Sequence, residues 1–299
     1  MPGELQIPLW EWWIVFYFFV GGIAGGAYFI AAAIELVGDP ADRPIARMGY
    51  YIAFPLALLS GLFLVLDLGV KLRFWHMLVY RKTLLPWPVL DSPISVGSYG
   101  LLIFSLFSFL SFMDAMVETG RLPWAPLRLR YNSLPRKIYA LLGGVAGFFL
   151  ASYTGVLVAT THLPLWASTP WLGGLFVASG ASTGLAAIAL GLMLTRAPVT
   201  SEAWLRLQRM DTVALLVELV LLVAFVGTLA LQGYGWSLGL VVLLGLTLVV
   251  GLVGPLVRLL RGTGRAHPAL RVAALAAVFI LLGGFALRLA IVMGGQGLL

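Results

Sequence analysis

The stretch WEWWIVFYFFVGGIAGGAYFIAAAIEL, from Trp10 to Leu36, determines how this chain must fold. Its part from Trp12 to Ile34 carries no charged residue, and as a helix it is long enough to cross a hydrocarbon core of about 30 Å. Within GGIAGG at 21–26, glycines recur four residues apart in two registers, which removes side chains from one face of the helix. We therefore predict a membrane-spanning helix with one face that packs closely against another backbone.

The composition extends this conclusion to the whole chain. Of its 299 residues, 61% are hydrophobic and 10% are charged, and the mean hydropathy is +1.01, which excludes an ordinary soluble domain. Cysteine is absent, so disulfides, iron–sulfur ligation and cysteine zinc sites are excluded within this chain, and any such centre must lie on a partner. The net charge of +7 comes from arginines in predicted loops, where it indicates topology and no nucleic-acid partner.

Seven further apolar segments follow the first, which spans 9–36. Each is bounded by proline, glycine or charge. Together they predict an all-α membrane protein with eight transmembrane helices, the later seven at 46–79, 94–117, 136–160, 170–194, 208–232, 236–260 and 270–293.

The basic residues predict the orientation of these helices. Fourteen of the 19 lie after the first, third, fifth and seventh helices, so the positive-inside rule places both termini outside. These fourteen are Arg43, Arg47, Arg121, Arg128, Arg130, Arg136, Lys137, Arg196, Arg206, Arg209, Arg258, Arg261, Arg265 and Arg271. On the opposite side, Lys71, Arg73, Arg81 and Lys82 lie in an aromatic, proline-rich connection that we expect to cap the helices, either as a solvated loop or as a docking surface for an extrinsic subunit.

A faint internal repeat is also present. FVGGIAGGAYFIAAAI, from Phe19, resembles FVASGASTGLAAIAL, from Phe176, in the spacing of its small residues. One interpretation is a pair of parallel four-helix halves, at 1–165 and 166–299. The other is that small residues recur at this spacing in any helical membrane protein.

Several ionisable residues lie inside predicted helices, where each costs roughly 2.5–3.5 kcal/mol to insert. Asp67 is eight or nine residues inside the outer end of the second segment, and Glu218 lies near the middle of the sixth. Arg288 is about two turns from the end of the eighth. Either Arg288 pairs with Asp67 or Glu218 to tie helices together, or these groups form a proton path whose candidates are Glu218, Asp211, Arg288 and Asp114. We favour the path for Glu218 and the structural role for Asp114 and Asp211, which lie near helix ends.

The three histidines exclude one cofactor and suggest another. His267 lies in an inner loop, while His76 and His162 lie at outer helix ends, so no transmembrane bis-histidine pair can form and we predict no haem and no metal in this chain. His162 follows Tyr153 by nine residues. Their imidazole and phenol either hydrogen-bond the two carbonyls of a quinone or anchor the helix at the interface.

Three stretches resemble the NrfD/PsrC family, the membrane subunits of polysulfide reductase and related molybdopterin or cytochrome respiratory complexes. They are FYFFVGGIAGGAYFIAAAIEL at 16–36, LLSGLFLVLDLGVKLRFWH at 58–76 with SPISVGSYG at 92–100, and ASYTGVLVATTHLPLW at 151–166. The resemblance implies a prokaryotic inner-membrane protein of two four-helix bundles, with menaquinone or ubiquinone at the outer end of the first. It also implies an extrinsic ferredoxin-like subunit with four iron–sulfur clusters, which leads to a molybdopterin or multihaem catalytic subunit.

The resemblance carries over to individual positions. Tyr153 matches the tyrosine that lines the family's quinone pocket. Two further quinone ligands in the first helix of polysulfide reductase become Ile14 and Tyr17 here, so one ligand is lost and Tyr17 remains as a possible donor. Glu11 and Asp67 lie near the expected pocket, where acids can exchange the quinone's protons.

Two other functions remain open. A secondary transporter is compatible with duplicated halves and buried charge, and it predicts broken helices and activity without extrinsic partners. A purely structural membrane anchor predicts that Tyr153 and Glu11 can be replaced without effect.

Overall fold

The computed structural model describes residues 10–79, 92–123, 133–161, 163–167, 169–262 and 270–299. These residues contain eight helices that are long and apolar enough to cross a membrane, which confirms the predicted eight-helix membrane fold. The spans are α1 (Trp12–Val37), α2 (Arg43–Leu66), α3 (Pro93–Glu118), α4 (Leu134–Ala159), α6 (Leu172–Leu194), α7 (Ser201–Leu231), α8 (Leu238–Leu246) with its continuation into α9 (Gly254–Gly262), and α10 (Leu270–Gly295). The described parts of the connections contain three short helices, namely η1 (Pro40–Asp42), η2 (Lys71–Met77) and α5 (Pro164–Ala167).

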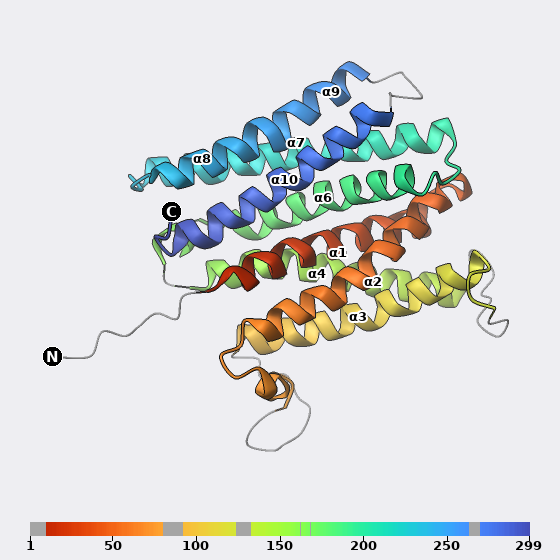
Figure 1. The fold of residues 1–299 in the computed structure, drawn as a ribbon, viewed down its shortest axis with the longest axis horizontal. Helices are drawn as coiled ribbons and strands as arrows, with labels where there is room; N and C mark the ends of the chain where they lie inside the picture. Colours follow the sequence, from red (N-terminus) through yellow and green to blue (C-terminus); the bar gives the residue numbers. More distant parts are fainter. Residues whose placement is uncertain (1–9, 80–91, 124–132, 162, 168, 263–269) are drawn as a thin grey trace.

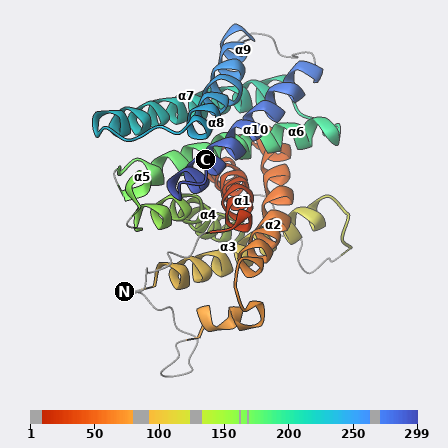
Figure 2. The same ribbon diagram turned by 60° about the vertical axis from the view of Figure 1, so that its left-hand side comes forward.

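The spans run side by side, with α1 in the middle of the molecule (Figures 1 and 2). α1 packs against α2, α4 and α6 and also touches α10. We call the two ends of the bundle the Glu11 end, where α1 begins, and the Arg43 end, where α2 begins. The orientation of these ends in the membrane stays a prediction.

The Glu11 end joins the first and last spans. The backbone N–H of Trp10 donates to Gln296 Oε1 at 2.5 Å, and Gln296 Nε2 donates to the Trp10 carbonyl at 3.3 Å. The Trp10 ring stacks on Trp166 of α5 with centroids 5.2 Å apart. The beginning of α1 and the end of α10 are therefore held together.

The glycine face of α1 packs against α6, as its spacing predicts. A Cβ atom at Gly26 would overlap the carbonyl oxygen of Gly180, and one at Gly184 would overlap the backbone of Gly26 and Ala27. The two stretches of the faint repeat thus lie against each other at one crossing. This crossing joins the two parts of the chain closely. The division into halves at 1–165 and 166–299 stays a prediction.

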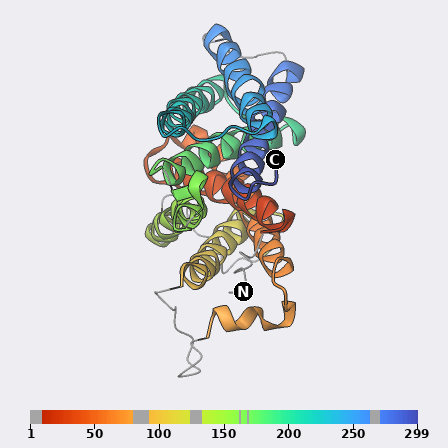
Figure 3. The same ribbon diagram turned by 90° about the vertical axis from the view of Figure 1, so that its left-hand side faces the viewer.

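The second span is shorter than its predicted segment of 46–79. α2 ends at Leu66, with Asp67 as its C-terminal cap residue, and the chain then forms η2, all of whose residues are exposed or half-buried. The charges of Lys71 and Arg73 explain this ending, because continuing the helix would place them in hydrocarbon. Figure 3, which looks along the bundle from the Glu11 end, shows η2 standing apart from the spans.

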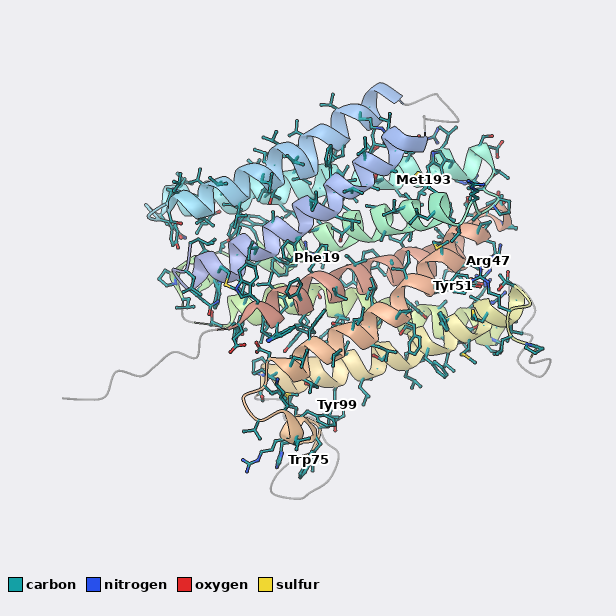
Figure 4. All side chains as sticks on the ribbon, viewed as in Figure 1. Phe19, Arg47, Tyr51, Trp75, Tyr99 and Met193 are labelled. Atoms are coloured by element: carbon teal, nitrogen blue, oxygen red, sulfur yellow. The ribbon has the colours of Figure 1, made fainter. Side chains whose placement is uncertain are left out.

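Serines and a tyrosine at the start of α3 hold η2 in place. The Ser95 hydroxyl donates to the Met77 carbonyl at 2.9 Å, and Tyr99 donates to the Leu78 carbonyl at 2.6 Å. Figure 4 shows Tyr99 on α3 close to η2, which carries Trp75. η2 is therefore the described part of the predicted cap, whereas residues 80–91, with Arg81 and Lys82, lie outside the described residues.

The seventh span contains a π-helical stretch, Thr247–Val253, just before Pro255. Proline has no N–H and its ring clashes with the carbonyl four residues earlier, here that of Gly251, so a wider turn relieves the clash. Gly251 also lies directly against Gly283 of α10, where a side chain on either would overlap the other. The span stays helical throughout, so it lacks the mid-membrane break that a transporter would require.

Candidate functional site

Tyr153 of α4 lies at the Glu11 end, against the start of α3. Its side chain is 7% exposed, and its hydroxyl donates to the carbonyl of Pro93. A Cβ atom at Gly97 would overlap the Tyr153 ring, and Phe149 stacks on the ring's face at 5.5 Å. These contacts explain the motif SP-x-S-x-G at 92–97. The carbonyl of its proline accepts the hydrogen bond from Tyr153, and its glycine leaves room for the tyrosine ring.

Tyr17 of α1 comes close to Tyr153. It is 1% exposed, and its side chain lies near that of Tyr153. The helix turn before Tyr17 contributes Ile14, which is buried and apolar. The structure therefore brings together two of the five residues that the sequence assigns to the quinone site, and both of them are phenols.

Asp67 and Glu11 form a second pair at the same end. The backbone N–H of Glu11 faces the Asp67 carboxylate, and the Glu11 carboxylate lies close enough to repel it. Oδ1 of Asp67 is buried without a hydrogen-bond partner among the described residues. Partial burial raises the pKa of Asp67 to about 6, because removal from water disfavours the charged carboxylate.

The histidines contribute little to this site within the described residues. His162 lies outside the described residues. His76 lies on η2, where it is exposed and stacks on Trp75 with centroids 3.8 Å apart. His267 also lies outside the described residues.

A separate polar series crosses the interior between α6, α7 and α10. Glu218 is 2% exposed and accepts a hydrogen bond of 2.5 Å from Ser182, and the Ser179 hydroxyl lies near the same carboxylate. Arg288, which is 1% exposed, donates through Nη1 to the Ser179 hydroxyl and to the Gly284 carbonyl. Ser179 therefore links the buried cation to the buried acid.

This arrangement decides between the two partners that the sequence offers for Arg288. Its guanidinium lies 5.3 Å above the ring of Phe176, close to Gly22 of α1, and it interacts electrostatically with Glu218. Asp67, at the end of α2, belongs to the pair with Glu11 instead. The predicted alternative of an Arg288–Asp67 ion pair is therefore wrong, and the link to Glu218 runs through a serine.

Asp211 lies on α7 two helical turns before Glu218, about 10 Å along the axis. The two carboxylates interact electrostatically, and Arg258 of α9 attracts Asp211. Asp211, Gln208 and Arg258 line a cavity of about 30 Å³, which is large enough to hold a water molecule. Oδ1 of Asp211 is buried without a protein partner among the described residues, so this cavity is a suitable place for that water.

The fourth proton-path candidate, Asp114, lies elsewhere, in an ion-pair cluster at the Arg43 end. Arg136 Nε donates to Asp114 Oδ2 at 2.6 Å, and its Nη2 lies 2.5 Å from Glu118 Oε2. Arg43 pairs with Glu35 and, at 2.6 Å, with Glu118. The cluster consists of Glu35 on α1, Arg43 on α2, Asp114 and Glu118 on α3, and Arg136 on α4.

Sequence reasoning missed this cluster because it assigned Arg43 and Arg136 to loops as topology signals. Both arginines instead lie in the first turn of a helix and are buried. The available signal was Glu35, an acid at the inner end of a long apolar helix. A carboxylate at that depth requires a nearby cation.

Comparisons with known proteins agree with this architecture. The profile of the family described as polysulphide reductase, NrfD matches residues 2–299. The protein is 28% identical to one of the polysulfide reductase chains of Wolinella succinogenes, over 75% of its own length and 71% of that relative. It is 27% identical to the NrfD protein of Escherichia coli over 79% of its length and 76% of that relative.

A shorter match links the protein to one of the selenate reductase subunits of Mesobacillus selenatarsenatis. It has 34% identity over 92 residues, which is 30% of this chain and only 21% of that relative. With the profile match across nearly the whole length and eight apolar spans, the chain belongs to the polysulphide reductase NrfD family, as a multi-pass membrane subunit of an oxidoreductase complex.

Proposed function

We propose that this chain is the quinone-reactive subunit of a respiratory complex, with its quinone site at the Glu11 end. The single observation that supports this most is the pair of buried phenols, Tyr17 and Tyr153, which approach each other from α1 and α4 at one helix end. They share that end with Asp67, whose buried Oδ1 has no partner among the described residues. Two phenol donors and an acid are the groups that a quinone's two carbonyls and two protons require.

The bound menaquinone or ubiquinone supplies the two-electron redox chemistry, which the side chains here do not provide. Tyr17 binds one carbonyl oxygen by hydrogen bonding, and Tyr153 binds the other once its hydroxyl turns from the Pro93 carbonyl to the quinone. Asp67 exchanges a proton with the quinone's oxygen. Glu11, which is exposed, passes that proton between Asp67 and water.

We infer that the electrons pass to or from an extrinsic subunit at the same end. Lys71 and Arg73 of η2 offer an exposed basic surface beside the site. The relatives include polysulfide and selenate reductase proteins, and we propose a ferredoxin-like iron–sulfur protein with four clusters as this partner. Beyond it we propose a molybdopterin or multihaem catalytic subunit, in a prokaryotic inner membrane.

We also propose a proton path through the second part of the chain. Asp211, Glu218, Ser179 and Arg288 form a polar series inside otherwise apolar helices. Carboxylates and hydroxyls can exchange protons along such a series, and an ionisable group at this depth needs a function or a partner. The ion-pair cluster with Asp114 has its charges paired, which favours a structural role for that residue.

We expect Tyr153→Phe to lower quinone turnover by roughly 10- to 100-fold, because the substitution removes one hydrogen bond to the reacting carbonyl. The ring should keep its place between Gly97 and Phe149, so the complex should still assemble. The measurement is quinol oxidation by the purified complex with a soluble electron acceptor. Tyr234→Phe, the same change at a half-buried position between α7 and α8, is the control, and equal rates in both variants would remove Tyr153 from the site.

We expect quinol oxidation to fall as the pH drops through about 6. Asp67 has its pKa raised to about 6 by partial burial, so above that pH it is a carboxylate that can accept the quinol's proton, and below it the acid is already protonated. Asp67→Asn should be slow and lose this transition, whereas Asp39→Asn at the exposed turn after α1 should keep it. A wild-type profile that is flat between pH 5 and 7 would contradict the proton-accepting role.

A further inference from the structure

The Arg43 end contains a pocket of about 430 Å³ between the two parts of the chain. One wall comes from α2 and the end of α3, and the other from the connection between α6 and α7. Its lining includes three guanidinium groups, from Arg47, Arg121 and Arg196, which we call the rim, and the apolar side chains of Met48, Phe112 and Met116, which we call the floor. A basic rim above an apolar floor matches the headgroup and acyl chains of a lipid.

The positive charge of this rim exceeds what nearby acids neutralise. Arg47 lies 3.5 Å from Glu118, but Glu118 is also bound by Arg43 and Arg136. The ion-pair cluster and Arg47 together contain three guanidiniums and the three carboxylates of Glu35, Asp114 and Glu118, so their charges balance.

Arg121 and Arg196 then add two positive charges, and within the described residues neither pairs with a carboxylate. Arg121 instead lies over the ring of Tyr51 at 5.2 Å. Tyr51 is fixed in turn, since its hydroxyl donates to the Ala115 carbonyl at 2.8 Å. Figure 4 shows Arg47 and Tyr51 at this end, between α3 and the part of α6 that carries Met193.

The backbone at Arg196 is a second, independent observation. This residue follows the end of α6 with φ of 49°, in the left-handed region. The N–H of Ala197 reaches the Leu192 carbonyl at 3.1 Å and that of Arg196 reaches Met193 at 3.3 Å, which is the helix ending that usually carries glycine. Glycine adopts this conformation more easily than arginine. The presence of arginine here is therefore consistent with a binding role for its side chain.

We propose that this pocket binds the phosphate headgroup of an anionic phospholipid. The pocket lies where the spans end, so its depth is that of the lipid headgroups, and basic pockets between transmembrane helices commonly hold such groups. The acyl chains would lie on the apolar floor. The bound lipid would join the wall from α2 and α3 to the α6–α7 connection, and this inference is independent of the quinone site.

The experiment measures lipid binding to the purified full-length protein in detergent by native mass spectrometry. The probes are phosphatidylglycerol, phosphatidylcholine and glycerol 3-phosphate. We expect phosphatidylglycerol to bind at least about tenfold more tightly than phosphatidylcholine, and the double variant Arg121→Gln/Arg196→Gln to lose that preference. Lys137→Gln, at a half-buried position in the first turn of α4 outside the pocket, should leave it unchanged.

A second variant, Thr195→Glu, adds negative charge to the rim with all three arginines intact and should also weaken binding of phosphatidylglycerol. Because Thr195→Glu keeps every arginine, it still tests the proposal if the double variant fails to fold. Equal binding of the two lipids would overturn the proposal, as would a preference that both variants retain. Binding of glycerol 3-phosphate as tight as that of the lipid would overturn it too, because the site would then hold a soluble anion.

Discussion

Gly26→Leu is expected to abolish correct folding of the membrane domain. A Cβ atom at Gly26 would overlap the carbonyl oxygen of Gly180, so α1 and α6 would have to move apart along their crossing. In a bilayer, helices associate through close packing and gain little from the hydrophobic effect, so the lost contacts have no substitute. We expect the yield of monodisperse protein to fall more than about tenfold, measured by fluorescence-detected size-exclusion chromatography of the tagged protein.

Gly227→Leu is the matched control for this experiment. Gly227 lies inside α7, and a Cβ atom there would meet nothing within 4 Å. Leucine is also a better helix former than glycine, so this variant should express at least as well as the wild type. A Gly26→Leu protein that elutes normally would show that the α1–α6 crossing is looser than described.

Glu218→Gln is expected to stop proton movement through the second part of the chain while electron transfer continues. Glutamine keeps the size of the side chain and can still accept the Ser182 hydrogen bond, but it cannot take up and release a proton. The proposed quinone site, at the Glu11 end, is left unchanged. The measurement is the number of protons moved per electron by the complex in proteoliposomes, which should fall to the value for quinone chemistry alone.

Glu202→Gln provides the control on the same helix. Glu202 is exposed in the first turn of α7, so the identical chemical change there should leave the proton-to-electron ratio at the wild-type value. If Glu218→Gln keeps the wild-type ratio as well, the buried carboxylate is a structural group held by Ser179 and Ser182. A fall in electron transfer with the ratio unchanged would also count against the path.

The sequence predicts the number of spans and the α1–α6 packing face because both depend on local patterns. Length and apolarity define a span, and glycines four residues apart define a smooth face. The ends of the spans were less predictable. α2 ends at Leu66 because the charges on η2 cannot enter hydrocarbon, and α7 begins at Ser201, where the Thr200 hydroxyl caps it by accepting from Ala203 N–H at 3.2 Å.

The candidate sites were predictable only as single residues. Tyr153 could be selected from a motif, but its partner Pro93 is 60 residues away. Likewise, the depth of Arg288 and Glu218 indicates that each needs a partner, while the serine between them depends on how α6 faces α7 and α10. Contacts of this kind follow from helix rotation, which local spacing does not determine.

The ion-pair cluster at the Arg43 end has a consequence for biosynthesis. Glu35, Arg43, Asp114 and Arg136 belong to four successive spans. During synthesis, Glu35 is therefore inserted before Arg43, and Asp114 before Arg136. While unpaired, the two arginines can still act as retention signals for the machinery that inserts the helices. Only when the fourth span has arrived can all four charges be neutralised. The cluster can therefore serve as an assembly checkpoint that reports the completion of the first four spans.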